Sequence, residues 1–566
     1  MKRGKTFVVL AALWAVCLCV FLQPMQASAD THTFKVISGA WGTATNWNPG
    51  SLPVNGDNAT IGTSTYSTRA IRTANYNYDG SSITLDTVTI QGYSSSYQGT
   101  LNIQSGTLKT GTLTINNNGN LNLSGGTLTT TNAINHTSGT FNQTGGTLDA
   151  NFRLNGGTVG TGTLSIINGK SFQYDKGTFN GRLKLNSGSS ATFTNDFTAG
   201  NGIENSTDLT FGSNRTLYLN GAGLNNLGTI TAQSGTLTLN ASGGTGGVTN
   251  NGIFDVASGA TMFITGGGTP FESTFKNYVS TSPTTGTLTG GTYNVKGTLR
   301  IPVQSTPDYH YVTANQATII LDGSGAKIWR TGSNTNALER LTTNDTAGVL
   351  TLKNGQAFSE SYANFTNKGT LNVIGSGSSF TASGKNYTQT AGLTNLAGGT
   401  LNASNVDIQG GILQGAGTIN APVTVSGSTT SINPGNSPGI LNINGNYNQT
   451  AGIINIELKN TSEYDQINIS GIANITGGDL YLHLVPGYSI TDFVDSFTLM
   501  TFAEGSDVSG LSLHDVFGTD TQGRELHFQF VVTPTSIIAN AVPIPPAVWL
   551  LGFGLVGLIG IRRRFA

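Results

Sequence analysis

One stretch of this 566-residue sequence, residues 269–345, mixes aromatic, basic and acidic side chains. Aromatic rings offer flat apolar faces, and a few polar groups beside them can hold and orient a ligand. We therefore take Tyr309, His310, Tyr311 and Trp329 as candidate residues for contact with sugar rings. The alternative interpretation of the stretch is a wider turn of the fold with a small core of its own.

Hydrolysis or elimination on a polysaccharide would need clustered charge, with paired carboxylates for acid–base work. The aspartates of the central region occur singly, and the only histidines between residues 81 and 476 are His136 and His310. The sequence therefore predicts no catalytic residue, no cofactor-binding residue and no metal ligand. A polysaccharide lyase or glycoside hydrolase, with its site in residues 269–345, is the alternative function.

The composition indicates which elements must carry such residues. The chain has 78 glycines, only 10% charged residues and a formal net charge of −1. Glycine costs about 1 kcal/mol in a helix interior, which disfavours helical bundles and coiled coils. The weak charge argues against a nucleic-acid binder. The 15 prolines, without glycine at every third residue, exclude collagen.

The centre of the chain is a repeat. The tripeptide Gly-Thr-Leu returns many times, and the glycines at positions 106, 126 and 146 are 20 residues apart. Apolar residues alternate within each unit, which is typical of strands with one buried face. Strands of three to five residues are too short to be stable as isolated hairpins. Stacking each strand on its counterpart in the next unit would bury the apolar column and leave Asn and Thr ladders outside or at the corners.

We therefore predict an all-β fold, a right-handed parallel β-helix (solenoid) of roughly 20 coils with terminal caps. The repeats cover residues 81–476, with an irregular insertion at about residues 269–345. The N-terminal cap is residues 30–80 and the C-terminal cap is residues 477–541. Asn-Gly dipeptides are good hairpin turns, so stacked antiparallel sandwiches are the alternative.

Both flanks resemble parts of exported bacterial proteins. Residues 32–80 contain W-G-T-A-T-N-W-N-P-G-S-L-P-V-N-G-D, which resembles the opening segment of many exported β-helix proteins. Residues 434–502 contain P-G-N-S-P-G, then G-N-Y, Y-D-Q-I and F-T-L. This succession resembles the C-terminal end of passenger domains in autotransporter-type and haemagglutinin-like surface proteins. The resemblance implies a surface protein on a β-helix, although no membrane barrel follows.

The N-terminus has the layout of a secretory signal peptide over residues 1–29. Three basic residues precede an apolar stretch, residues 7–22, and Ala27 and Ala29 form a small-residue cleavage site. The apolar stretch has 16 residues, fewer than the roughly 20 that span a membrane. We expect export through the Sec machinery, and a membrane anchor is the alternative.

The C-terminal segment, residues 542–566, has a proline-bearing motif, a short apolar run and a basic end. The residues of this signal are Val542, Pro543, Pro545, Trp549, Arg562, Arg563 and Arg564. The segment resembles the VPLPA-CTERM variant of the PEP-CTERM sorting signals, with Ile544 and Pro546 in place of the usual third and fifth letters. The resemblance implies a transmembrane segment, transient inner-membrane anchoring and cleavage by an exosortase. A plain C-terminal anchor is the alternative.

Together these features predict an exported, non-enzymatic protein of the cell surface or extracellular matrix of a Gram-negative bacterium. Without both terminal signals the chain keeps 21 basic and 28 acidic residues, a net charge of −7. We expect an adhesive or structural role linked to exopolysaccharide and biofilm. The expected partners are exosortase, the Sec machinery and exopolysaccharide or other surface glycans, and nucleic acid is not expected.

Overall fold

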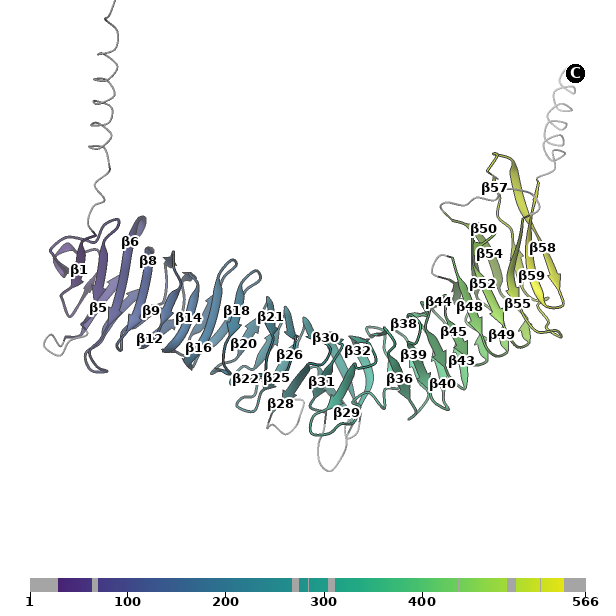
Figure 1. Cartoon of the computed structure of the whole chain (residues 1–566), viewed down its shortest axis with the longest axis horizontal. Helices are drawn as coiled ribbons and strands as arrows, with labels where there is room; N and C mark the ends of the chain where they lie inside the picture. The colour runs from purple at the N-terminus through teal and green to yellow at the C-terminus, as the bar shows by residue number, and fades with distance from the viewer. Residues whose placement is uncertain are drawn as a thin grey trace, which may run out of the picture. The chain divides into compact units, whose positions relative to one another are not determined.

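The structure is a computed structural model that describes residues 29–63, 70–266, 274–282, 285–303, 311–435, 438–485, 495–519 and 521–543. These residues form an all-β fold, and the one helix among them is a single 3-10 turn, Ala44–Asn46. The strands stack as parallel coils of a β-solenoid of about 19 turns (Figure 1). The prediction of a parallel β-helix is confirmed.

The chain divides into two compact units, Met1–Asn195 and Asp196–Ala566. In the first unit, a representative turn contains three short strands that pair in parallel with the three strands of the next turn. Asn120 aligns with Thr140 and Thr127 with Thr147, so this turn takes 20 residues, as the Gly-Thr-Leu spacing predicts. The six strands are β9 (Asn120–Leu123), β10 (Thr127–Thr130), β11 (Ile134–His136), β12 (Thr140–Gln143), β13 (Thr147–Asp149) and β14 (Phe152–Val159).

Alternation along each strand decides which side chains enter the core. Leu121, Leu123 and Leu128 are completely buried. Asn120 and Asn122, which alternate with the first two leucines, are half-buried on the outer face. Burying one such leucine stabilises the fold by about 1.5–3 kcal/mol. Neighbouring turns therefore hold each other through a shared apolar column.

Glycine occupies the corners where the backbone leaves the right-handed regions. Gly126 and Gly146 precede β10 and β13 and have φ of +66° and +64°. A Cβ at Gly126 would lie 2.5 Å from the carbonyl oxygen of Gly106 in the turn before. The repeated glycine is required both by its φ and by the close approach of successive turns.

The second unit continues the same plan, and its first turns are longer. Asp208 aligns with Thr229 and Leu224 with Val248, and the strands of these two turns pair in parallel. The strands of these two turns are β21 (Asp208–Phe211), β22 (Arg215–Leu219), β23 (Leu224–Asn226), β24 (Thr229–Ala232), β25 (Thr236–Asn240) and β26 (Val248–Asn250). Parallel pairing of this kind excludes the alternative of antiparallel sandwiches.

The Asn-Gly dipeptides that favoured this alternative do not form hairpin turns here. Asn155 and Gly156 lie inside β14, which pairs in parallel with β16 (Ser171–Phe179). Gly156 has φ of +136° at a register shift between the two strands. The dipeptide therefore bends a strand at a bulge and does not reverse the chain.

Some of the predicted corner ladders are buried: their amides lie where strands end and are completely covered. In the second unit Asn205, Asn226 and Asn250 are completely buried on successive turns, and each Nδ2 donates to the next Oδ1 at 2.8 Å. Asn315, Asn344 and Asn367 repeat the arrangement at 2.9 Å. These residues end strands β20 (Ile203–Asn205), β23, β26, β34 (Thr343–Asn344) and β37 (Phe365–Asn367), and Asn315 lies within β32 (Tyr311–Asp322). Each buried amide is satisfied by its neighbour, so burial costs little.

The first strands close over an aromatic cluster. β1 (Thr31–Phe34) pairs in parallel with β4 (Asn58–Ile61) and antiparallel with β3 (Trp47–Asn48). The Trp47 ring is completely buried, 4.7 Å from the ring of Trp41, and its Nε1 donates to the Trp41 carbonyl at 2.8 Å. These tryptophans are core residues of the first turns.

The last described strands depart from parallel stacking. β58 (Glu525–Thr533) and β59 (Ser536–Pro543) form an antiparallel hairpin, and β59 also pairs antiparallel with β55 (Ser496–Thr501). The hairpin lies beside the final coils (Figure 1). It gives the final coil a neighbouring strand, which limits pairing with other chains.

Residues 269–345 remain part of the solenoid where they are described. β29 (Tyr278–Ser282) and β30 (Thr285–Val295) form an antiparallel hairpin, while β30 pairs in parallel with β27 (Ile253–Val256) and β32. The parallel column β28 (Thr261–Thr265), β31 (Thr298–Ile301) and β33 (Lys327–Arg330) also continues through this stretch. The irregularity is therefore an added hairpin within continuing coils.

Candidate functional site

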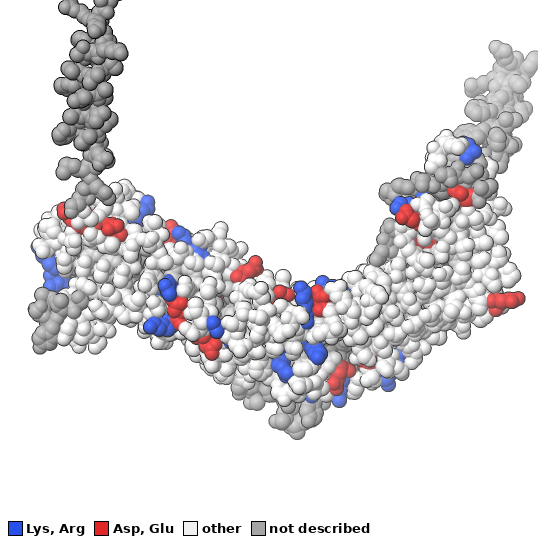
Figure 2. All heavy atoms as spheres, in the orientation of Figure 1, with Lys and Arg blue, Asp and Glu red and all other residues white. Residues whose placement is uncertain are grey.

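The outer faces of both units carry rows of amide and hydroxyl groups. In the first unit, the Nδ2 atoms of Asn102, Asn122 and Asn142 each donate to the Oδ1 of the preceding asparagine in the row at 2.8 Å; the row starts at Asn75. The spacing of the row follows the coil spacing of about 4.8 Å. Such a surface presents regularly repeated, nearly uncharged hydrogen-bonding groups. Charged residues are scattered over the visible surface, most of which is uncharged (Figure 2).

In the second unit, one outer row borders a cavity of about 690 Å³. The row runs across four parallel strands, β44 (Ile412–Gly415), β47 (Ser431–Pro434), β50 (Ile453–Asn460) and β54 (Asp479–Leu484). We call this cavity the polar groove. Its lining residues are Gln414, Asn433, Pro434, Gly435, Asn455, Glu457, Asp465 and His483.

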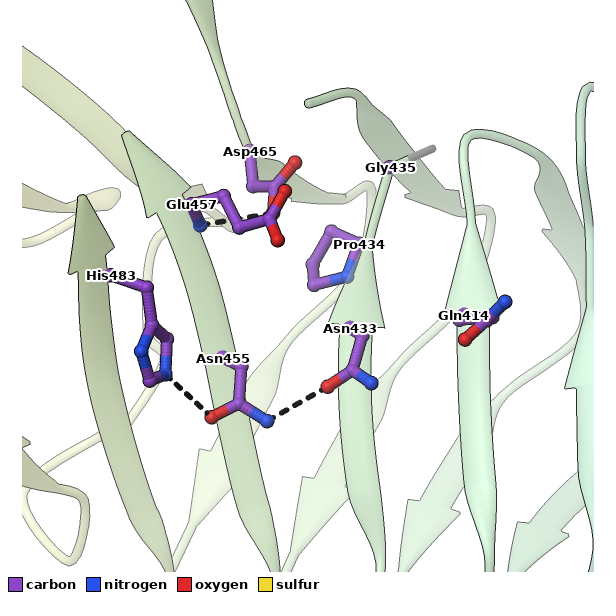
Figure 3. Close-up of a pocket in the computed structure, with 8 residues that line it drawn as sticks. All are labelled: Gln414, Asn433, Pro434, Gly435, Asn455, Glu457, Asp465 and His483. Carbon is purple, nitrogen blue, oxygen red and sulfur yellow. Dashed lines mark hydrogen bonds between the residues drawn. The ribbon is translucent and has the colours of Figure 1, made fainter. Parts of the chain in front are cut away.

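Three side chains along the groove are joined by hydrogen bonds (Figure 3). Asn455 Nδ2 donates to Asn433 Oδ1 at 2.8 Å, and His483 Nε2 lies 3.0 Å from Asn455 Oδ1. The second contact assigns the proton to Nε2 of His483, because the amide oxygen can only accept. Strand pairing thus places one polar group per coil along the groove and fixes the orientation of each.

Two carboxyl groups lie at one end of the groove in different environments. Asp465 is 1% exposed; its Oδ1 accepts from Gly439 N at 2.7 Å and its Oδ2 from Glu457 N at 3.0 Å. Burial raises the pKa of Asp465 to about 7, and the nearby Glu457 carboxylate adds to the rise. Asp465 therefore fastens the turn at Gly439 to β50, while half-buried Glu457 is the carboxylate that a ligand could reach.

This arrangement suits a polar ligand with several hydroxyl groups. Amide, imidazole and carboxylate groups can each donate to or accept from a hydroxyl. A sugar chain lying along the groove would meet one such group on each coil. Among the described residues, no group of three or more histidine, cysteine, aspartate or glutamate side chains could hold a metal ion.

The predicted sugar-contact residues fall in different environments. Tyr309 and His310 lie outside the described residues. Tyr311 is only 5% exposed, and the guanidinium carbons of Arg330 and Arg340 lie 4.7 and 4.1 Å from its ring centroid. Its ring is therefore a packing surface for arginine, with little area left for a sugar.

Trp329 is half-buried on the outer face of β33. The guanidinium carbon of Arg300 lies 4.9 Å from its ring centroid and the Nζ of Lys327 lies 5.0 Å from it. We call Trp329, Arg300 and Lys327 the cationic platform. Of the four predicted sugar-contact residues, Trp329 is the one that the structure places where a ligand could reach it.

The residues of the two terminal signals lie mostly outside the described part of the chain. Ala29 is exposed just before β1, and Ala27 is not described. Val542 and Pro543 form the end of β59, where they pair with His527 and Leu526. Pro545, Trp549, Arg562, Arg563 and Arg564 lie outside the described residues. Within the described part, the chain forms no helix with the length and apolar character of a membrane span.

The polar groove was not found from the sequence. Gln414, Asn433, Asn455 and His483 each lie one turn from the next and look like ordinary outward residues of the repeat. One sequence feature could have indicated the groove: Asp465 takes a position that the alternating pattern would otherwise give to an apolar residue. Comparison with known proteins adds no assignment: no family model matches this chain, and no curated protein matches it either.

Proposed function

We propose that this protein is an exported, non-enzymatic surface or matrix protein that adheres to glycans along its solenoid. The observation that carries the proposal is the outer row of hydrogen-bonded amides, exemplified by Asn75, Asn102, Asn122 and Asn142. Each amide binds a hydroxyl weakly, but many repeated contacts to one polymer raise the overall affinity by orders of magnitude. Adhesion therefore comes from the length of such rows, and the polar groove is a further contact surface along one outer row of the second unit.

The terminal signals support export as part of the proposal. The residues before Asp30 have the order of a signal peptide. The C-terminal segment resembles a PEP-CTERM signal, so we propose that an exosortase removes it and that the mature chain stays at the cell surface or in the exopolysaccharide matrix. Mass spectrometry of the protein recovered from cells and medium tests this part. A mature, localised protein that still ends at Ala566 would contradict it.

Retention on polysaccharide tests adhesion directly. The purified chain without both signals should be retained on immobilised exopolysaccharide from the source bacterium. Because the proposed contacts are mainly between uncharged groups, much of the retention should persist in about 0.5 M salt, where long-range charge attraction is screened. Failure to bind this polymer at any ionic strength would contradict the proposed adhesion.

The polar groove offers a sharper variant for the same assay. Asn455→Ala removes the amide that joins Asn433 to His483 and should weaken binding of short oligosaccharides by about 2- to 10-fold, the cost of one or two hydrogen bonds. Asn122→Ala, in the row of the first unit, is the matched control for loss of an outward amide. Equal effects of both substitutions on short oligosaccharides would mean that the groove has no special part in binding.

A further inference from the structure

We propose that the cationic platform binds acidic glycans, meaning sugar polymers whose rings carry carboxylates. This inference rests on the proposed glycan adhesion and specifies a ligand class for one part of the surface. It concerns the outer face of β28, β31 and β33. The polar groove is built from other strands, β44 to β54, later in the chain.

Strand register brings the residues of the platform together. Phe263, Arg300 and Trp329 align across β28, β31 and β33, and each is half-buried on the outer face. Lys327 lies two residues before Trp329 on the same strand and therefore points to the same side. The two aromatic rings thus flank one guanidinium group in a single row.

The two cations are held in place by the indole ring. Both lie about 5 Å from the ring centroid of Trp329, at 4.9 Å for Arg300 Cζ and 5.0 Å for Lys327 Nζ, within the range of cation–π attraction. Arg300 is also oriented through Nη1, which donates to the Ser333 carbonyl at 2.9 Å, and Nη2, which donates to Asn334 Oδ1 at 2.6 Å. The guanidinium group is therefore positioned before any ligand binds.

The platform also carries positive charge without a carboxylate beside it. Two other cations of this protein, by contrast, are neutralised: Lys170 Nζ lies 2.8 Å from Asp149 and Lys353 Nζ lies 3.3 Å from Asp322. Within the described ranges, neither Arg300 nor Lys327 forms an ion pair. On a surface with few charges, two such neighbouring cations attract an anion.

These features together fit a carboxylated sugar ring. A carboxylate can accept from the remaining N–H groups of Arg300 and from the ammonium of Lys327 at the same time. The apolar face of the ring can then pack against the exposed parts of Trp329 and Phe263. A neutral sugar would make the apolar contact but leave both cations without an anion, so the platform should distinguish the two.

Two polymers with one backbone test this distinction. Polygalacturonate carries a carboxylate on every ring, and its fully methyl-esterified form does not. We expect the full-length protein to bind polygalacturonate about 10-fold more tightly than the ester, and the difference should shrink as salt is raised to about 0.5 M. Lys327→Gln and Arg300→Gln should each weaken binding to polygalacturonate by up to about 5-fold, the range measured for exposed charge pairs. Binding to the ester should change little.

Trp329→Ala should weaken binding to both polymers, because it removes the apolar contact and releases both cations. Tyr218→Ala is the matched control, since Tyr218 is a 40% exposed aromatic residue on β22 of the same sheet. Lys368→Gln, at an exposed lysine, is the control for loss of charge. All these residues face outward, so unchanged thermal midpoints should show that every variant folds.

The outcomes separate the inference from the proposed function. Equal binding of the two polymers, or binding to polygalacturonate that all three platform variants retain, would overturn the inference and leave glycan adhesion intact. Binding to neither polymer would also overturn it, and retention on the bacterial exopolysaccharide would then show whether adhesion itself survives. Tighter, Trp329-dependent binding of oligothymidylate would assign the platform to nucleic acid and overturn the inference.

Discussion

Asn344 Nδ2 donates to Asn367 Oδ1 at 2.9 Å, one turn further along the solenoid, and both side chains are completely buried. The same Nδ2 donates to the Thr370 carbonyl at 3.0 Å, and Asn315 donates to Asn344 Oδ1 from the other side. Each amide of this inner row therefore depends on the turns before and after it. The row specifies the register of neighbouring coils in addition to stabilising them.

Replacing Asn344 by alanine should therefore destabilise the second unit strongly. The substitution leaves the buried Asn315 amide and the buried Asn367 Oδ1 without this partner, at about 1–3 kcal/mol for each unsatisfied group. Asn372→Ala is the control, because Asn372 donates to Thr351 Oγ1 at 3.2 Å in a half-buried outer row. Urea denaturation followed by circular dichroism should show a much lower midpoint for Asn344→Ala than for Asn372→Ala. Equal midpoints would show that the inner row adds nothing.

Corner glycines should differ in their tolerance of a side chain. Gly126→Ala forces a residue with φ of +66° and a Cβ 2.5 Å from the Gly106 carbonyl oxygen. Gly169→Ala has a similar φ of +73° but meets open space. We expect a cost of about 1 kcal/mol at Gly169, from backbone strain alone, and a clearly larger cost at Gly126. Comparison of the two thermal midpoints checks this, and a smaller loss at Gly126 would refute the close packing of successive turns.

His136 should make the first unit less stable in acid. Its ring is completely buried, and burial lowers its pKa to about 4 from an ordinary value near 6.5. The unfolded chain binds the proton first, so stability should fall by about 1.4 kcal/mol per unit as the pH drops from 6.5 toward 4. His136→Leu should flatten this part of the pH profile, because leucine binds no proton. The variant should still fold, since the Gly139 carbonyl keeps its bond from Thr158 N. An unchanged slope between pH 4 and 6.5 would exclude His136 as its source.

Asp465 should act in the opposite direction in the second unit. Its pKa is raised to about 7, so the folded chain binds the proton more tightly than the unfolded chain does. The stability that this proton supplies is complete below about pH 4 and is lost as the pH rises toward 7. Asp465→Asn should remove the decline between about pH 4 and pH 7. It should also lower stability overall, since an amide cannot accept from both Gly439 and Glu457. A decline that persists in the variant would contradict the assignment.

The fold could be predicted from the sequence because its determinants are local and repeated. Alternating residues such as Leu121 and Leu123, and the glycines at 126 and 146, specify a short strand and a corner in every turn. The inner amide row could not be predicted, because Asn344 has the same local pattern as an outward asparagine. Only the register of neighbouring turns determines which asparagines face inward.

The candidate sites show the same limit. Trp329 was found because it lies in the stretch that mixes aromatic and charged side chains. Its partner Arg300 is 29 positions earlier and is brought to it only by strand pairing. Tyr311 has the same residue class as an exposed sugar contact but is covered by arginine. The polar groove combines Asn433, Asn455 and His483 from three coils, and no spacing in the sequence marks it.

One measurement tests the proposed function most directly. The purified chain without its terminal signals is incubated with soluble exopolysaccharide, and the bound fraction is recorded together with the release of reducing ends and unsaturated sugars over time. We expect binding that saturates while the polymer length and the number of reducing ends stay constant. Time-dependent release of new chain ends that scales with protein concentration would show catalysis and contradict a purely adhesive protein.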